Sequence, residues 1–163
     1  MRRLIIGDIH GCHAELQDLL DRAALSAEDE IIALGDIVDR GPDSPRVLEF
    51  FRTHPHARSL MGNHERKHVR SFAGEIPPAR SQQITRHQLG YAYPAAVAFV
   101  ETFPTSFDLP EATLVHGFWP PGRALADQAA KAPDSKPSAK IRSGAGASRR
   151  SCTRARRRRA RKA

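Results

Sequence analysis

The chain has 163 residues, of which 40% are hydrophobic and 27% are charged, and its formal net charge is +8. This length is enough for one compact domain. No apolar run approaches the roughly 18 residues that a membrane-spanning helix needs, and Asp8 interrupts the first apolar run too early for a secretory signal. Two cysteines are too few for a disulfide framework. We therefore expect a globular, cytoplasmic protein that does not enter a membrane.

The positive charge is concentrated at the C-terminal end of the chain. Residues 131–163 contain 13 Lys and Arg against one acidic residue, a net charge of +12. Residues 1–130 contain 13 Lys and Arg against 17 Asp and Glu, a net charge of −4. The tail is rich in Pro, Ser, Ala and Arg and cannot bury enough apolar surface to fold alone, so we expect it to be disordered. Non-specific contact with nucleic acid through this tail is an open alternative, although the tail offers no aromatic side chain for base stacking.

Three times in the first 65 residues, an apolar run ends in glycine followed by Asp or Asn. Short continuous apolar runs of this kind are typical of buried parallel strands. The predicted strands are residues 4–6, 31–34 and 59–61, followed by Gly7-Asp8, Gly35-Asp36 and Gly62-Asn63 respectively.

Helical patterns lie between these strands. Residues 14–25 place Leu and Ala on one face at spacings of three and four. Ser44-Pro45 begins a second helix with a capping residue and a proline in the first turn. Residues 81–103 are predicted to be helical in two pieces, broken near Pro94. The alternation of strands and helices predicts an α/β fold.

Such sheets place their functional residues just beyond the carboxyl ends of the strands. A further strand is predicted at residues 112–115, and it also ends in a polar residue. The side chains predicted to gather at the strand ends as metal ligands are Asp8, His10, Asp36, Asn63 and His116. A mixed set of carboxylate, imidazole and amide ligands suits Mn²⁺, Fe or Zn²⁺ better than Ca²⁺. We therefore predict two divalent metal ions, with Mn²⁺ as the first choice and Fe or Zn²⁺ as alternatives.

The predicted ligands divide into two sets that share Asp36. Asp8 and His10 are two residues apart across a tight turn, so both can reach one ion. Asn63 and His116 would serve a second ion, and Asp36 would bridge the two at about 3.5–4 Å. A water bridging two such ions can be acidified to a pKa of about 7, which makes it able to attack phosphorus.

Three further residues are predicted to act on the substrate. His64 follows Asn63 directly, and we expect it to protonate the leaving alkoxide while Asp39 orients its ring. Arg40 offers a two-pronged clamp for a phosphate group. Four other histidines are expected to be solvated surface residues: His54, His56, His68 and His87.

The blocks of sequence that contain these residues resemble a known family. Gly7-Asp8-Ile9-His10-Gly11, Gly35-Asp36-Ile37-Val38-Asp39-Arg40-Gly41 and Gly62-Asn63-His64-Glu65 are similar to the three signature blocks of the phosphoprotein phosphatase (PPP) family of calcineurin-like metallophosphoesterases, and Val115-His116-Gly117 is similar to its fourth block. The resemblance covers residues 3–130. It implies a sandwich of two sheets flanked by helices, a dinuclear metal centre, and hydrolysis of phosphomonoesters or phosphoanhydrides.

The sequence departs from this family in two places. Met61 stands where the protein phosphatases usually carry a second phosphate-binding arginine, and a hydrophobic residue there is also found in the related diadenosine tetraphosphatases. The family also has a later histidine ligand, whereas no histidine follows His116 in this chain. We therefore expect an incomplete metallophosphoesterase domain at residues 1–130 and a basic tail at 131–163. From about residue 133 onward, we expect the tail to be the product of a frameshift or fusion.

Several functions fit these observations. The intact Asp39-Arg40 pair favours a serine/threonine-type protein phosphatase or a small phosphomonoesterase, acting on a phosphorylated protein or a small phosphoester. Met61 favours the alternative of a diadenosine tetraphosphate hydrolase. An inactive truncated fragment and a nucleic-acid binder that works through the tail are the other two alternatives.

Overall fold

The structure is a computed structural model, and it describes residues 1–117. The predicted basic tail lies outside the described residues. Within them, no helix is long and apolar enough to cross a membrane. The elements in chain order are β1 (Arg3–Ile6), α1 (His13–Ala23), β2 (Glu30–Ala33), α2 (Ser44–Thr53), β3 (Ala57–Ser59), α3 (Asn63–Phe72), α4 (Arg80–Leu89), the 3₁₀ turn η1 (Gly90–Ala92), α5 (Tyr93–Glu101), β4 (Ser106–Asp108) and β5 (Thr113–Val115).

The first three strands form one parallel sheet in the order β1-β2-β3, as the apolar runs predict. The central strand β2 is apolar on both faces, and Ile31, Ile32 and Ala33 are all buried. The edge strand β1 is less covered, since Ile5 is 40% exposed. Strand β3 begins and ends two residues earlier than predicted, although the Leu60 amide still donates to the carbonyl of Ala33 at 3.0 Å.

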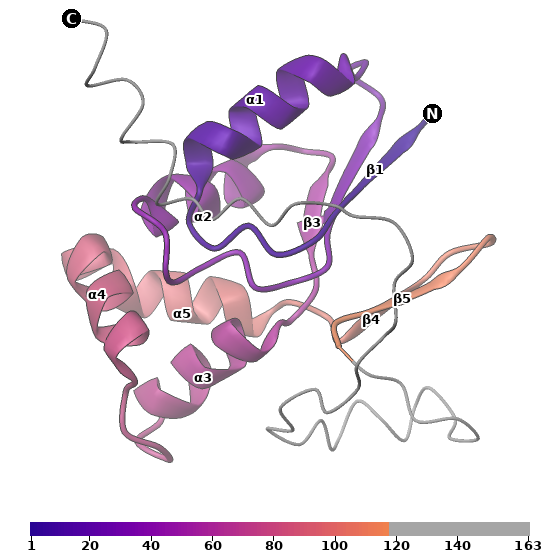
Figure 1. Cartoon of the computed structure of the whole chain (residues 1–163). Coiled ribbons are helices and arrows are strands. Elements are labelled where there is room, and N and C mark those ends of the chain that lie inside the picture. The colour runs from indigo at the N-terminus through magenta and orange to yellow at the C-terminus, as the bar shows by residue number, and fades with distance from the viewer. Residues whose placement is uncertain (118–163) are drawn as a thin grey trace, which may run out of the picture.

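Helices α1 and α2 lie together on one side of this sheet, and α3, α4 and α5 form a second group beside its strand ends (Figure 1). The hydrophobic core joins α1 and α2 to the sheet through Leu16, Val47 and Phe51, which cluster with Ile6 and Ile31. The apolar stripes of the two helices are therefore what holds the strand ends in place.

The start of α2 differs from the prediction. The N-cap is Asp43, not Ser44, and the Asp43 side chain accepts a hydrogen bond from the amide of Arg46 at 3.2 Å. Ser44 is instead the first residue of the helix and is buried, where its hydroxyl accepts from the amide of Asp39 at 3.1 Å. Asp43 has the non-helical backbone that a cap requires. The proline in the first turn, Pro45, is as predicted.

The break in the predicted helical region 81–103 precedes the expected proline. Gly90 has a positive φ of 52° and ends α4, and a short 3₁₀ turn follows. Pro94 lies in the first turn of α5, where its missing N–H leaves no helical hydrogen bond unmade. The chain is therefore turned by the glycine, and the proline begins the next helix.

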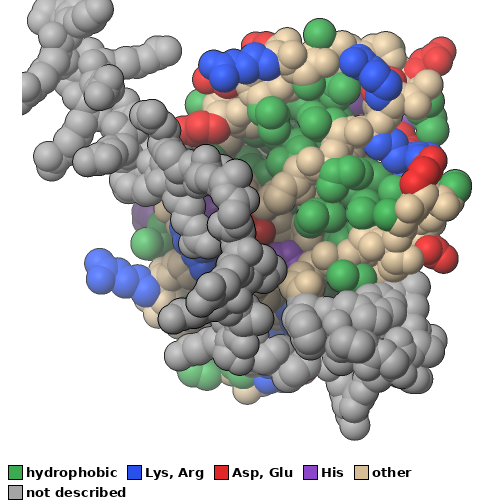
Figure 2. All heavy atoms as spheres, turned by 45° about the vertical axis from the view of Figure 1, so that its right-hand side comes forward, with side chains coloured by type: hydrophobic (Ala, Val, Ile, Leu, Met, Phe, Trp, Pro, Cys, Tyr) green, Lys and Arg blue, Asp and Glu red, His purple; other side chains and the backbone are tan. Residues whose placement is uncertain are grey.

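The fourth predicted strand, residues 112–115, is observed as β5 at Thr113–Val115. It pairs antiparallel with β4, which the sequence did not predict, and the two form a second sheet. The Arg58 guanidinium of β3 lies over the Phe107 ring of β4 at 4.6 Å from its centroid, which connects the two sheets. Hydrophobic side chains gather on the side of the molecule where the strands lie (Figure 2). The two sheets and flanking helices confirm the predicted α/β class.

Candidate metal and phosphate site

Backbone hydrogen bonds tie together the loops that follow β1 and β2. The amide of His10 donates to the carbonyl of Asp36 at 2.9 Å, and the amide of Gly11 donates to the carbonyl of Ile37 at 2.8 Å. The Gly11 carbonyl in turn accepts from the amide of Asp43 at 2.9 Å. The two strand-end corners are therefore held as one rigid unit.

The backbone of these loops is strained at the predicted site residues. In residues 1–117, five residues other than glycine have a positive φ. One is Ala24, which ends α1; the others are His10 (49°), Asp36 (52°), Asp39 (70°) and Arg40 (65°). Such conformations cost free energy and are concentrated at functional sites. This backbone strain, which does not depend on the residue types, supports the interpretation that the two loops form a functional site.

Glu65 holds the second loop to the third strand end, a role that the sequence did not predict. Its side chain is fully buried, and its carboxylate accepts from the amides of Asp36 (2.8 Å), Ile37 (2.9 Å), Val38 (3.2 Å) and Gly62 (3.0 Å). Burial and the nearby charge of Asp36 raise the pKa of Glu65, while the backbone amides oppose this rise. The sequence feature that could have indicated this role is the position of Glu65 as the third residue of α3, where a glutamate can cap the helix.

Two histidines have one ring nitrogen fixed by a backbone carbonyl. Nδ1 of His10 is 3.0 Å from the carbonyl oxygen of Val38, and Nδ1 of His116 is 2.8 Å from that of Leu34. A carbonyl can only accept, so both Nδ1 atoms carry the proton and donate. The Nε2 atoms are left as acceptors directed into the site, which is the tautomer that metal-binding histidines use.

Acceptor atoms therefore face one another around His116. Its Nε2 lies 3.1 Å from Oδ1 of Asn63 and 3.5 Å from Oδ1 of Asp36. Lone pairs this close repel unless a cation lies among them. This cluster of nitrogen and oxygen lone pairs fits a divalent metal ion at the position that the sequence predicts.

Within residues 1–117, two groups of side chains lie close enough to share a metal ion: Asp8, Asp36 and His116, and His10, Asp36 and His64, with ligand atoms within 4.8 Å of one another in each. Asp36 belongs to both groups, in keeping with its predicted bridging position. The grouping differs from the prediction in that Asp8 lies with His116 and the predicted acid His64 lies with His10. Asp8 nevertheless stays near His10, since its Oδ2 is 3.6 Å from Nε2 of that ring.

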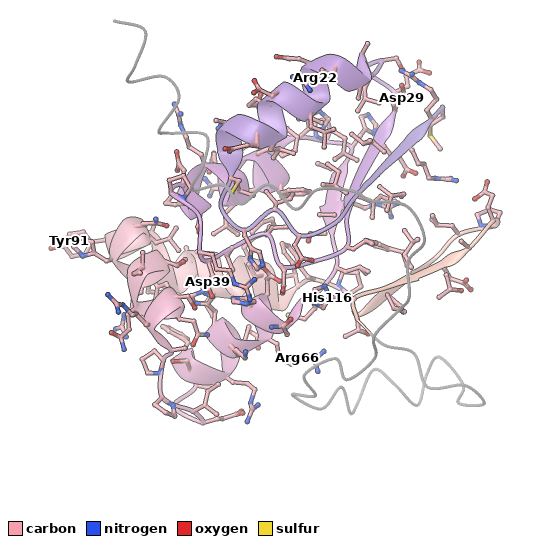
Figure 3. All side chains as sticks on the ribbon, in the orientation of Figure 1. Arg22, Asp29, Asp39, Arg66, Tyr91 and His116 are labelled. Atoms are coloured by element: carbon pink, nitrogen blue, oxygen red, sulfur yellow. The ribbon has the colours of Figure 1, made fainter. Side chains whose placement is uncertain are left out.

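The predicted acid pair is formed. Nδ1 of His64 donates to Oδ2 of Asp39 at 2.6 Å, and both side chains are buried. Burial raises the pKa of Asp39, but hydrogen bonds from His64, His68 and Thr85 outweigh it and hold this pKa below its usual range. Asp39 is therefore ionised and can hold the proton on Nδ1 of His64. Asp39 and His116, both labelled in Figure 3, lie in the region between the strand ends and α3.

Arg40 lies between the two imidazoles that face it. Its Nη1 donates to Nε2 of His10 at 2.9 Å and its Nη2 donates to Nε2 of His64 at 3.0 Å. The Arg40 side chain is exposed, so a phosphate group entering from solvent can reach its guanidinium. The positive charge that the sequence predicts as a phosphate clamp is thus beside the predicted acid.

One of the four histidines expected to be solvated is not. His68 is 3% exposed, and it contacts both Asp39 and the Tyr93 hydroxyl. His56 and His87 are exposed, as expected, and His54 is half-buried. No local sequence pattern indicates that His68 is buried, because its burial depends on α4 and α5, whose positions relative to α3 follow only from the tertiary structure.

Comparison with known proteins decides the family. Residues 1–124 match the calcineurin-like phosphoesterases. The chain belongs to this family. The symmetrical bis(5'-nucleosyl)-tetraphosphatase of Shewanella baltica is 36% identical over 130 residues, which cover 77% of this chain and 47% of the relative. The protein of the same name from Erwinia tasmaniensis is 45% identical over 76 residues, which cover 45% of this chain and 28% of the relative.

The chain spans about half the length of the Shewanella relatives that it matches. Among solved structures, a candidate diadenosine tetraphosphatase is 27% identical, with a TM-score of 0.59 over 77% of this chain and 54% of that one. A metallophosphoesterase of Sphaerobacter thermophilus is 28% identical, with a TM-score of 0.55; the match covers 69% of this chain and 45% of that one. A serine/threonine phosphatase of Saccharomyces cerevisiae has a TM-score of 0.56, and the match covers 87% of this chain and 45% of that one. It is only 22% identical, so this likeness shows the fold alone.

Proposed function

We propose that this chain carries the metal and phosphate site of a hydrolase that splits dinucleoside tetraphosphates symmetrically into two nucleoside diphosphates. The observation that carries the proposal is the 36% identity over 130 residues to proteins named as symmetrical tetraphosphatases. The protein phosphatase that the Asp39-Arg40 pair first favoured has weaker support, because the phosphatase from yeast shares only the fold. The comparisons thus favour what the sequence offered as the alternative.

The proposed ligands of the two ions are the residues predicted from the sequence. Asp8, His10, Asp36, Asn63 and His116 offer oxygen and nitrogen donors, and Mn²⁺ is the ion we propose. Two divalent ions bound there would neutralise the phosphate oxygens and activate a water. The protein supplies the geometry for this chemistry: Glu65 fixes the backbone of Asp36, and the carbonyls of Val38 and Leu34 fix the rings of His10 and His116.

The proposed work of the remaining site residues is to bind the substrate and to move one proton. Arg40 binds a phosphate through its planar guanidinium, and His64, held by Asp39, supplies a proton when the leaving group is a poor anion such as an alkoxide. Met61 is half-buried and gives the site no second cationic clamp.

The test is a substrate panel assayed with the purified chain and Mn²⁺. Diadenosine tetraphosphate, a phosphoserine peptide and p-nitrophenyl phosphate are compared at equal concentration, and the nucleotide products are separated by anion-exchange chromatography. We expect the tetraphosphate to be hydrolysed fastest and ADP to be its only product, because a symmetrical cut yields two equal halves.

The matched control is Asp36→Asn, which removes the charge shared by both candidate metal groups but keeps the side-chain size. Hydrolysis that is unchanged by this substitution comes from a contaminating enzyme. If phosphate is released from the peptide faster than the tetraphosphate is hydrolysed, the proposal is contradicted and a protein phosphatase is favoured instead. A mixture of AMP and ATP would contradict the symmetrical cut.

A further inference from the structure

The Asp39 carboxylate is fully buried and accepts hydrogen bonds on both of its oxygens. Oδ2 accepts from Nδ1 of His64 at 2.6 Å and from the Ser81 hydroxyl at 3.4 Å. Oδ1 accepts from Nε2 of His68 at 2.9 Å and from the Thr85 hydroxyl at 2.6 Å. Each oxygen therefore serves one imidazole, and only one of these imidazoles belongs to the predicted site.

His68 lies one helical turn after His64 on α3, so both rings project from the same face of the helix. Its Nδ1 is 3.1 Å from the Tyr93 hydroxyl at the start of α5, and the two rings meet edge to face with centroids 5.7 Å apart. A carboxylate can only accept, so Nε2 of His68 carries a proton, and in the neutral ring Nδ1 then accepts from the Tyr93 hydroxyl. A directed chain of hydrogen bonds thus runs from Tyr93 through His68 to Asp39.

Packing alone does not account for a histidine at this position. The surroundings of His68 are mostly apolar, because it lines a small cavity together with Val38, Leu48, Val97 and Val100. Burying an imidazole there costs free energy of desolvation, whereas burying a leucine would not. The polar partners that offset this cost are Asp39 and Tyr93, so the contact with Asp39 explains why an imidazole is tolerated.

We propose that His68, supported by Tyr93, is a positioning residue that holds the Asp39 carboxylate in the orientation that presents Oδ2 to His64. Donors from α3 and α4 converge on Oδ1, which fixes the plane of the carboxylate as well as its place. This inference rests on the proposed hydrolase function, because it assigns His68 a part in orienting the acid. The partners of the His68 ring nitrogens are Tyr93 and Asp39, neither of which is a proposed metal ligand.

The experiment compares two substitutions of His68. His68→Leu keeps the size but removes the donor to Asp39, and His68→Gln keeps an N–H donor near the position of Nε2. Tyr93→Phe removes only the hydroxyl behind His68. The matched control is His87→Leu, which changes an exposed histidine on a neighbouring helix. Thermal melting of each variant shows whether it is folded.

Phenyl phosphate and p-nitrophenyl phosphate are the substrates, since phenolate needs a proton on leaving far more than p-nitrophenolate does. We expect His68→Leu to slow phenyl phosphate hydrolysis by about 10–100-fold, the usual loss when the partner of a site residue is removed, and to leave p-nitrophenyl phosphate nearly unchanged. His68→Gln should recover most of the loss, and Tyr93→Phe should show a smaller loss of the same kind. In a His64→Asn background, His68→Leu should have no further effect, because the two residues act through one pathway.

Equal losses on the two substrates, or an undiminished effect of His68→Leu in the His64→Asn background, would overturn the proposal. A readout without turnover separates it from the proposed function. The downfield NMR signal of the His64 Nδ1 proton should persist in His68→Gln and be lost to solvent exchange in His68→Leu. If the wild-type chain hydrolyses no phosphoester, the proposed function fails, and an unchanged His64 signal in folded His68→Leu would then overturn the positioning role as well.

Discussion

At the scale of single residues, two fully buried carboxylates organise the site and differ in what surrounds them. Asp39 accepts from two imidazoles and a buried hydroxyl, and its pKa is held below the usual range despite its burial. Glu65 accepts from backbone amides, but burial and the negative charge of Asp36 raise its pKa. The ionised Asp39 carboxylate therefore accepts a hydrogen bond from the protonated ring nitrogen of His64. The Glu65 carboxylate fixes the loop that presents Asp36, whose charge calls for a cation nearby.

The proposed acid role of His64 predicts a dependence on the leaving group. His64→Asn should slow hydrolysis of phenyl phosphate by about 10²–10⁴-fold, the usual contribution of a general acid. Hydrolysis of p-nitrophenyl phosphate and of diadenosine tetraphosphate should fall much less, because their leaving groups depart as stable anions. Steady-state rates on the three substrates provide the measurement, and an equal loss on all three would remove His64 from the acid role.

At the scale of elements, the corners between strands and helices fix the site, and their glycines are not equivalent. A Cβ on Gly62 would lie 2.3 Å from both the amide nitrogen and Oδ1 of Asp36 and 2.5 Å from Oε2 of Glu65. A Cβ on Gly7 would meet nothing within 4 Å. Both glycines directly precede a proposed metal ligand, so they form a natural pair for comparison.

Gly62→Ala should therefore disrupt the site while Gly7→Ala leaves it intact. We expect Gly62→Ala to lower the free energy of unfolding by about 1–3 kcal/mol, as overpacking does, and to weaken Mn²⁺ binding by displacing Asp36. Gly7→Ala should change stability by no more than about 0.5 kcal/mol. Chemical denaturation and calorimetry with Mn²⁺ measure the two effects, and indistinguishable variants would show that the corner after β3 relaxes freely.

At the scale of the whole molecule, the charge is divided between two parts of the sequence. Residues 1–130 have a net charge of −4 and residues 131–163 a net charge of +12. Any non-specific attraction to nucleic acid is therefore expected of the basic segment, and it should be distinct from recognition of a phosphate substrate by Arg40.

This division predicts a salt-dependent, sequence-independent affinity for duplex DNA. Replacing the four arginines at positions 156–159 with glutamine should reduce the slope of log affinity against log salt by up to about 3.6, because up to four phosphates are no longer neutralised. Hydrolysis of small phosphoesters should not change. Fluorescence anisotropy with a random duplex at several salt concentrations provides the measurement, and an unchanged slope would place the DNA contact outside the arginine run.

Much of the site could be read from the sequence because its residues follow apolar runs. Once residues 4–6 and 31–34 are recognised as parallel strands, their carboxyl ends must meet at one edge, and Asp8 and Asp36 come together there. His116 was identified because it follows the predicted strand 112–115, and its block also resembles a family block, although its strand belongs to a second, antiparallel sheet. The position of β3 was missed by two residues, since the apolar run continues past the last pair of the ladder.

The sequence by itself determined which residues we propose for the chemistry, because glycine-flanked Asp, Asn and His at strand ends form a local pattern. Only the tertiary structure decided what holds those residues in place. The contacts of Glu65 with the amides of Asp36 and Val38, and of His68 with Tyr93, join segments separated by 25 residues or more. His68 does not differ locally from other polar residues on a helix, and the position of Glu65 as third residue of α3 indicates a helix cap but not its contacts with the loop after β2. Their roles arise from burial against other elements, and burial is a property of packing that no short stretch of sequence contains.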